Sequence, residues 1–188
     1  MLFLGAKQYT SDINSLTAKE STVSFSSDSY LRIKGESNVN TFECQFDMNT
    51  ISDAVKIKYK DYNNKIKFDD TKLILPNLEF DCGGKAINKD FNELLNTEEF
   101  PQITLKLKEI AEVDINQSTV IATVEITISN IVRTYKVPVA VNRDNNLRVS
   151  GKMPLDINDF DLVAPTKMLG MIKVSPKIEI QFSLNIRS

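Results

Sequence analysis

The chain has 188 residues, of which 41% are apolar, and this is enough for one domain with a hydrophobic core. Its net charge is -2, with 23 basic and 25 acidic residues mixed along the sequence. This balance gives no single-sign field to attract nucleic acid or an anionic membrane surface. No run reaches the about 18 apolar residues of a membrane-spanning helix, so we expect a soluble chain without stable membrane insertion.

The sequence contains no histidine, which removes the commonest general base and a usual zinc ligand. Ser-His-Asp and Cys-His sites cannot be built, and no pair of carboxylates stands out by its spacing. Asp156, Asp159 and Asp161 are close in sequence but lack the glycine and the closing glutamate of a usual calcium loop. We therefore predict no enzymatic activity, no cofactor and no metal site.

The first six residues, Met1 to Ala6, are apolar or small and are typical of the end of a signal peptide. A basic start is missing and Leu4 occupies a position where a small residue is preferred, so an ordinary apolar N-terminus fits equally well. No linker, repeat or low-complexity tract divides the remainder. We treat residues 1–19 as an N-terminal segment and residues 20–188 as one domain.

Apolar and polar residues alternate strictly over residues 177–187, and this period of two predicts a strand with one buried face. The same alternation spans residues 119–129, 135–141 and 147–157. Shorter alternating segments precede them, around Val23, Leu31, Phe42, Val55, Leu78 and Ile103. Polar turns separate these segments. The pattern predicts an antiparallel all-β protein, and periodicity alone leaves a sandwich and a barrel open.

Residues 88–96 break the alternation, because Phe91, Leu94 and Leu95 follow the spacing of one helix face. Asn88 is suited to cap this helix, and its apolar stripe is expected to cover a barrel end or a sheet edge. A second irregular segment, residues 158–176, carries apolar residues around Pro165 and Gly170. We expect it to pack against the barrel rim or against a ligand.

Several segments resemble YceI-like proteins in the same order along the chain. Residues 30–42, with the run Gly35-Glu36-Ser37-Asn38-Val39, resemble an early strand of that family. Residues 87–103 resemble its step from a short helix through an acidic-aromatic-Pro-x-Ile segment into a strand, and residues 155–174 resemble its final part. The resemblance covers about residues 20–186 and implies an antiparallel eight-stranded, lipocalin-like barrel with one short helix.

The resemblance also implies a function: a periplasmic or secreted protein that holds a polyisoprenoid or similar apolar lipid in the barrel. Burial of a long apolar chain gives affinity without polar contacts or catalysis, at about 25 cal/mol per Å² removed from water. The alternative is a structural or protein-interaction barrel whose own side chains fill the interior. The sequence leaves the oligomeric state open, a homodimer included.

Candidate lining residues are apolar side chains on the inward strand faces and methionines of the irregular segment. They are Phe42, Phe46, Phe80, Val124, Ile126, Tyr135, Val137, Val149, Met153, Met168, Met171, Ile180, Phe182 and Leu184. For each one, ordinary core packing is the simpler interpretation, because an alternating apolar face is buried in any sheet protein. Their role as a lipid-binding surface is a hypothesis that rests on the resemblance.

The two cysteines, Cys44 and Cys82, are in phase with the apolar residues of their predicted strands, so both should point inward. In an exported protein this predicts a disulfide. In the cytosol they would instead be two small buried hydrophobic side chains.

Overall fold

The structure is a computed structural model that describes residues 18–51, 54–62, 64–111, 118–143, 146–167 and 169–187. Most of the predicted N-terminal segment, residues 1–17, lies outside the described residues. The first strand begins at Lys19. The elements are β1 (Lys19–Phe25), β2 (Tyr30–Glu36), β3 (Thr41–Phe46), η1 (Met48–Thr50), β4 (Val55–Tyr62), β5 (Lys65–Asp69), β6 (Lys72–Pro76), η2 (Asn77–Glu79), β7 (Phe80–Asp81), α1 (Lys85–Leu94), β8 (Gln102–Ala111), β9 (Thr119–Ile128), β10 (Ile131–Asn142), β11 (Leu147–Asp156), η3 (Ile157–Phe160), β12 (Thr166–Lys167), β13 (Ile172–Lys173) and β14 (Lys177–Arg187).

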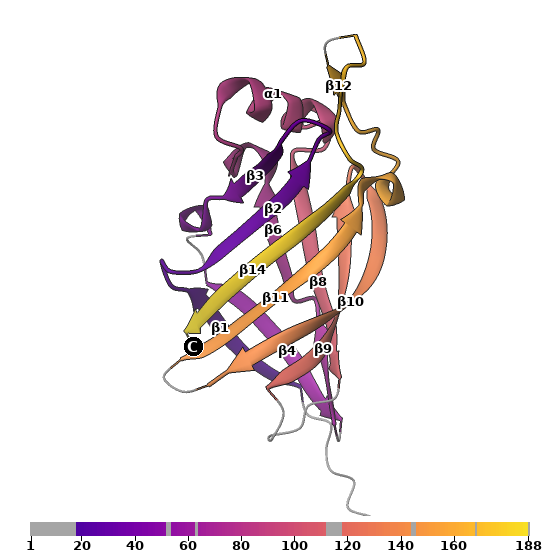
Figure 1. The fold of residues 1–188 in the computed structure, drawn as a ribbon. Helices are drawn as coiled ribbons and strands as arrows, with labels where there is room; N and C mark the ends of the chain where they lie inside the picture. Colours follow the sequence, from indigo (N-terminus) through magenta and orange to yellow (C-terminus); the bar gives the residue numbers. More distant parts are fainter. Residues whose placement is uncertain are drawn as a thin grey trace, which may run out of the picture.

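Eight antiparallel strands close into a ring in the order β1, β4, β5, β8, β9, β10, β11 and β14. The ring closes where β14 pairs with β1, through Ser24 with Arg187 and Phe25 with Ile186. Beyond this seam β2, β3 and β7 extend the sheet toward the end of the barrel where α1 lies (Figure 1). The predicted antiparallel barrel with one helix is confirmed for the described part of the chain.

The alternation in the sequence sets the register of the wall. The long strands β9 and β10 pair continuously from Ile131 with Ile128 to Ala140 with Thr119. A two-residue turn joins them, and its residues Ser129 and Asn130 both have positive φ, 46° and 64°. Such turns match the right-handed twist of the strands. They fix which face of each strand points into the barrel.

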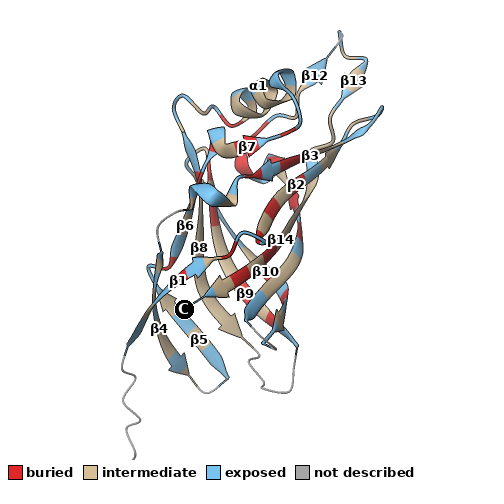
Figure 2. Cartoon of the chain, turned by 90° about the vertical axis from the view of Figure 1, so that its left-hand side faces the viewer, coloured by how far each residue is buried: buried red, intermediate tan, exposed pale blue. Residues whose placement is uncertain are grey.

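The tightly packed core lies at the α1 end of the barrel. Phe46 packs edge-on against Phe80 with ring centroids 5.0 Å apart, and Phe80 meets Phe91 of α1 at 5.2 Å. Figure 2 shows buried residues on β2, β3 and β7 near this end. By contrast, β4 and β5 contain no buried residue. The strands β4 and β5 are therefore less buried than the elements packed beneath α1.

The helix begins three residues earlier than expected, at Lys85, and Gly84 occupies the N-cap position. The expectation that Asn88 caps the helix was wrong. Its side-chain oxygen accepts a hydrogen bond from the Cys82 amide at 2.7 Å, and its amide nitrogen donates to Asp81 at 3.0 Å. Asn88 therefore ties the helix to the end of β7.

The strand expected around Leu78, Phe80 and Cys82 is only partly present. The longer strand here is β6, which pairs with β8. It gives way to the η2 turn after Pro76, where Leu78 is 74% exposed. Only Phe80 and Asp81 form the short strand β7. The Asn77 side chain holds the turn by donating to the Phe100 carbonyl at 2.8 Å and to the Thr97 hydroxyl at 3.1 Å.

Cys44 and Cys82 are joined by a disulfide, as predicted. The pairs Gln45 with Asp81 and Phe46 with Phe80 place the two cysteines at the next position of the β3–β7 ladder. Both are buried, with exposed fractions of 1% and 7%. The bond therefore fastens the end of the short strand β7, and with it the start of α1, to β3.

We expect removal of this disulfide to lower the free energy of unfolding substantially. The bond closes a loop with a sequence separation of 38, and the chain-entropy model gives about 4 kcal/mol for such a loop. Urea unfolding of the Cys44→Ala/Cys82→Ala variant measures this loss. The variant should also be insensitive to reductant, whereas the wild type should lose stability on reduction. Equal stability of oxidised and reduced wild type would contradict the expectation.

A polar cluster fastens the seam where the barrel closes. Asp28, in the connection between β1 and β2, accepts hydrogen bonds from the Ser26 hydroxyl at 2.7 Å and the Asn185 amide at 3.1 Å. It also pairs with Arg148 of β11 at 2.7 Å. The hydrogen bonds from Ser26 and Asn185, followed by the charge of Arg148, hold the pKa of Asp28 below its ordinary value of 3.8.

This lowered pKa predicts a pH-dependent contribution to stability. Because the folded state favours the carboxylate, the contribution is fully present above about pH 4 and is lost as the pH falls toward the lowered pKa. We expect wild type to be more stable than Asp28→Asn near neutral pH, with the difference shrinking below about pH 4. Urea midpoints over a pH series measure this. A difference that stays constant with pH would show that the charge of Asp28 is irrelevant.

Candidate functional site

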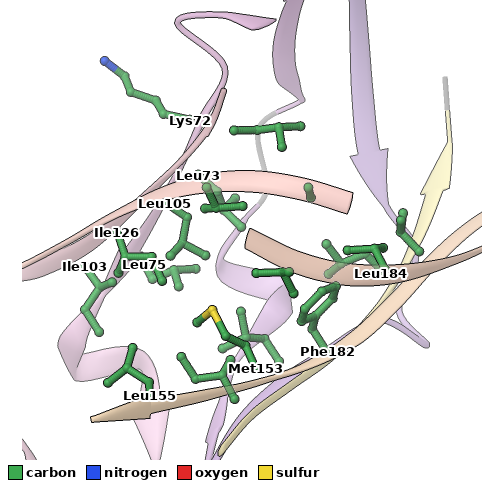
Figure 3. A pocket seen from close by; sticks show the side chains of 18 of the residues that line it. Lys72, Leu73, Leu75, Ile103, Leu105, Ile126, Met153, Leu155, Phe182 and Leu184 are labelled. Atoms are coloured by element: carbon green, nitrogen blue, oxygen red, sulfur yellow. The ribbon is translucent and has the colours of Figure 1, made fainter. Parts of the chain in front are cut away.

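A cavity of about 630 Å³ occupies the interior of the barrel, and its wall is almost entirely apolar. Strand β14 shows its extent, because Ile178, Ile180, Phe182, Leu184 and Ile186 all line it. Eight residue steps span about 26 Å along a strand. With the usual tilt of barrel strands this gives a cavity about 20 Å long. In Figure 3, side chains of β6, β8 and β9 face those of β11 and β14 across this space.

The barrel is hollow, and the exposure of β14 demonstrates it. Inward residues such as Phe182 and Leu184 are only half-buried, whereas the outward-facing Ser183 and Asn185 are buried. In a filled core the inward side chains would be more buried than the outward ones, because they would touch one another. The chain's own side chains therefore do not fill the interior.

Two glycines keep aromatic rings against the wall. Gly35 is paired across the strands with Phe42, and Gly151 with Phe182. A Cβ atom at Gly151 would lie 2.7 Å from Cζ of Phe182, and a Cβ atom at Gly35 would overlap the Phe42 ring. Each ring therefore covers the bare backbone of the neighbouring strand. Both rings line the cavity.

The two ends of the cavity differ in their lining. At one end lie Phe91, Leu94 and Leu95 of the helical segment, together with Val174 and Ser175. At the other end lie residues of β4, β5, β8 and β11 and of the connection after β10. They include Tyr59, Ile66, Ile110, Arg143 and Leu147.

Charged groups contribute little to the wall. Among the described residues of the wall, only Lys72 and Arg143 carry charge. Figure 3 shows the Lys72 amino group pointing away from the apolar side chains, and this group lies 3.8 Å from Asp70. The described residues contain no group of three or more Cys, Asp or Glu side chains that could hold a metal ion. None of their helices is long and apolar enough to cross a membrane.

Ten of the fourteen candidate lining residues lie in the cavity wall, and their contact with a ligand stays a prediction. They are Phe42, Phe80, Val124, Ile126, Val137, Val149, Met153, Ile180, Phe182 and Leu184. Met168 lies outside the described residues.

The other three candidates lie away from the cavity wall. Phe46 is completely buried in the aromatic core beneath α1. The Tyr135 hydroxyl donates to Asp159 at 3.1 Å, and burial, followed by this hydrogen bond, raises the pKa of Tyr135 to about 12. Met171 is 70% exposed beside β13. Alternation and apolar character in the sequence do not distinguish a residue that lines the cavity from one that packs elsewhere or is exposed.

Sequence reasoning missed the cavity residues of β5 and β6. Ile66 and Phe68 alternate with lysines and an aspartate, which is a strand signal, but the segment has only five residues. Leu73 and Leu75 flank the exposed Ile74 in a short apolar run that ends at Pro76. Such short runs are the least certain of strand signals.

The fold and the cavity together define a hollow, lipocalin-like antiparallel β-barrel. A model of the YceI-like domain matches residues 77–186, and the chain belongs to this family. The resemblance seen in the sequence is thereby confirmed.

The solved structures similar to this chain include the following two. BcnA of Burkholderia cenocepacia superposes with a TM-score of 0.60 at 18% identity, over 85% of this chain and 96% of its own. A polyisoprenoid-binding domain from Saccharophagus degradans, implicated in plant cell wall breakdown, gives a TM-score of 0.61 at 11% identity, over 89% and 97%. No curated protein sequence matches the chain.

The close approach of Gly35 and Phe42 predicts how the cavity can be narrowed. In Gly35→Ala the new methyl group would overlap the Phe42 ring, and we expect the ring to move into the cavity that it lines. We expect a fluorescent apolar probe to bind about tenfold more weakly, equivalent to about 1.4 kcal/mol. Gly35→Ala/Phe42→Leu should restore binding because it removes the displaced ring. Unchanged binding by the single variant would show that the ring moves elsewhere.

Proposed function

We propose that the protein is a non-catalytic, extracytoplasmic carrier or store that holds a polyisoprenoid or similar apolar lipid in the barrel. The observation that carries this proposal is the continuous apolar cavity of about 630 Å³ inside a closed ring of strands. An empty apolar cavity costs stability because its lining lacks partner atoms. A lipid chain supplies those atoms and removes its own surface from water.

The shape of the cavity favours a long chain over a compact ligand. The space extends along the strands for about 20 Å, and branched aliphatic side chains and phenylalanines line it throughout. Such a wall gives close contact with a methyl-branched hydrocarbon and no hydrogen bond for a polar one. The similar fold of a polyisoprenoid-binding domain supports the same ligand class.

The chemistry of the wall supports binding without catalysis. The chain has no histidine. The polar side chains in the wall, Ser21, Tyr59, Thr71, Lys72, Arg143 and Ser175, are scattered over several elements. A nucleophile needs an adjacent base within hydrogen-bond distance, and the described contacts of these side chains include none.

An extracytoplasmic location is supported by the Cys44–Cys82 disulfide. Disulfides persist in oxidising compartments and are rare in the cytosol. A carrier in such a compartment moves an apolar molecule through water between membranes.

Native mass spectrometry of the gently purified protein, followed by organic extraction, tests the proposal directly. We expect a stoichiometric lipid that is released on denaturation and identified as an isoprenoid or similar chain. An empty protein that also fails to take up a long-chain isoprenoid alcohol would contradict the proposal.

A cavity-filling substitution gives the matched test. Ala122 lies on the inward face of β9 and lines the cavity, whereas its neighbour Thr123 is outside the lining. We expect Ala122→Phe to lower the affinity for a long-chain isoprenoid alcohol at least about tenfold, because the new ring occupies the ligand's space. Thr123→Phe should bind like wild type. Equal affinity of all three proteins would place the ligand outside the barrel.

A further inference from the structure

Exposed apolar side chains gather at the α1 end of the barrel. Leu169 is fully exposed, Met171 is 70% exposed and Val39 is 63% exposed. Leu169 and Met171 belong to the hairpin formed by β12 and β13, which projects beyond the barrel end beside α1 (Figures 1 and 2). We call Val39, Leu169 and Met171 the apolar tip.

Hydrogen bonds join the turn that carries Val39 to the part of the hairpin that carries Met171. The Asn38 side chain donates to the Met171 carbonyl at 2.9 Å and accepts from the Lys173 amide at 2.8 Å. Ser37 and Val174 form an isolated antiparallel β-bridge. The turn that carries Val39 is therefore fixed beside the hairpin.

The backbone presents Leu169 to solvent in an unfavourable conformation. Leu169 has a φ of 57° and Gly170 a φ of 88°. Glycine accepts a positive φ without cost, but leucine rarely adopts it, and turns at such positions favour asparagine, aspartate or glycine. Leu169 is thus disfavoured both by its backbone and by its full exposure. This combination points to a partner that covers the side chain.

The charges and size of the hairpin favour a lipid membrane as that partner. Its charged residues are two lysines, Lys167 and Lys173. Lys167 pairs with Asp90 of α1 at 2.6 Å, whereas Lys173 has no acidic group within salt-bridge distance in the described part of the chain. A stable protein interface buries roughly 800 Å² per partner, more than three tip side chains provide. Apolar side chains flanked by lysines instead suit the interface of a bilayer.

The hairpin is continuous with the cavity. Val174 and Ser175 follow β13 directly, and both line the cavity. Phe91 and Leu94 of α1 line the same end, next to Asp90. A membrane that covers the apolar tip would therefore lie beside one end of the lipid-binding space.

We propose that the apolar tip inserts into the surface of a lipid membrane and docks the α1 end of the barrel there. Because the net charge of the chain is -2, docking depends on apolar contact rather than on long-range attraction. The inference rests on the proposed function for its purpose, which is exchange of lipid between membrane and cavity. The docking itself is measured without any cavity ligand.

A single tryptophan reports docking, since the natural chain contains none. In Leu169→Trp we expect the fluorescence to shift to the blue when vesicles of phosphatidylethanolamine and phosphatidylglycerol are added. Leu78→Trp is the matched control, because Leu78 is 74% exposed and lies in η2, outside the β12–β13 hairpin. Its emission should not change. No shift at position 169, or equal shifts at both positions, would overturn the proposal.

Vesicle flotation with the native side chains gives the second test. We expect Leu169→Glu/Met171→Glu to bind these vesicles at least tenfold more weakly than wild type, and Leu78→Glu to bind like wild type. Unfolding midpoints should remain unchanged, because the substituted side chains are exposed. Wild type that does not float, or a double variant that floats equally well, would overturn docking.

Two further measurements separate docking from its alternatives. Sedimentation without vesicles compares the oligomeric states of the two proteins. If wild type is a dimer and the double variant is a monomer, the tip is a protein interface and the proposal is overturned. Uptake of a soluble isoprenoid alcohol should be the same in wild type and the double variant. If neither protein takes up the alcohol while wild type still docks on vesicles, the proposed function alone is overturned.

Discussion

The pairing of the last strand with the first two is the constraint on which the rest of the structure depends. Strand β14 pairs with β2 over residues 179–183 and with β1 at residues 186 and 187. The connection between β1 and β2 contains buried Ser26 and Ser29, which bond to the backbone of Asn185 at 3.2 and 2.9 Å. Closure of the ring turns one apolar face into an interior. Without this seam the inward side chains of β14 would face water.

Closure alone does not make a cavity, because eight-stranded barrels are narrow enough to be filled by side chains. Here four phenylalanine rings pack at the α1 end or against the bare backbone of a neighbouring strand. Phe46 and Phe80 pack under α1, and Phe42 and Phe182 lie over Gly35 and Gly151. The aromatic core and the disulfide stabilise one end of the barrel. The remainder can stay hollow, and a bound ligand adds to its stability by mass action.

The sequence predicts most strands of the barrel wall, but it does not predict that the interior is hollow. Strands β9, β10, β11 and β14 follow from strict alternation, because the side-chain period of a strand is independent of its neighbours. Strands β5 and β6 were missed because they are short. The displacement of Asn88 from its expected capping role depends on its contacts with Asp81 and Cys82, which form only when α1 packs against β7. Hollowness depends on pairs such as Gly151 with Phe182, which are distant in sequence, and no local pattern reveals them.

Charge and apolar surface act at different ranges in this protein. The mixed charges give no field to hold it at an anionic membrane, and many surface lysines are paired, such as Lys58 with Glu20 and Lys65 with Glu109. The exposed apolar groups at the tip act only on contact, and their small area gives reversible attachment. A carrier must leave the membrane after each exchange. Weak short-range contact beside the cavity meets this requirement, whereas a strongly basic surface would retain the protein at the membrane.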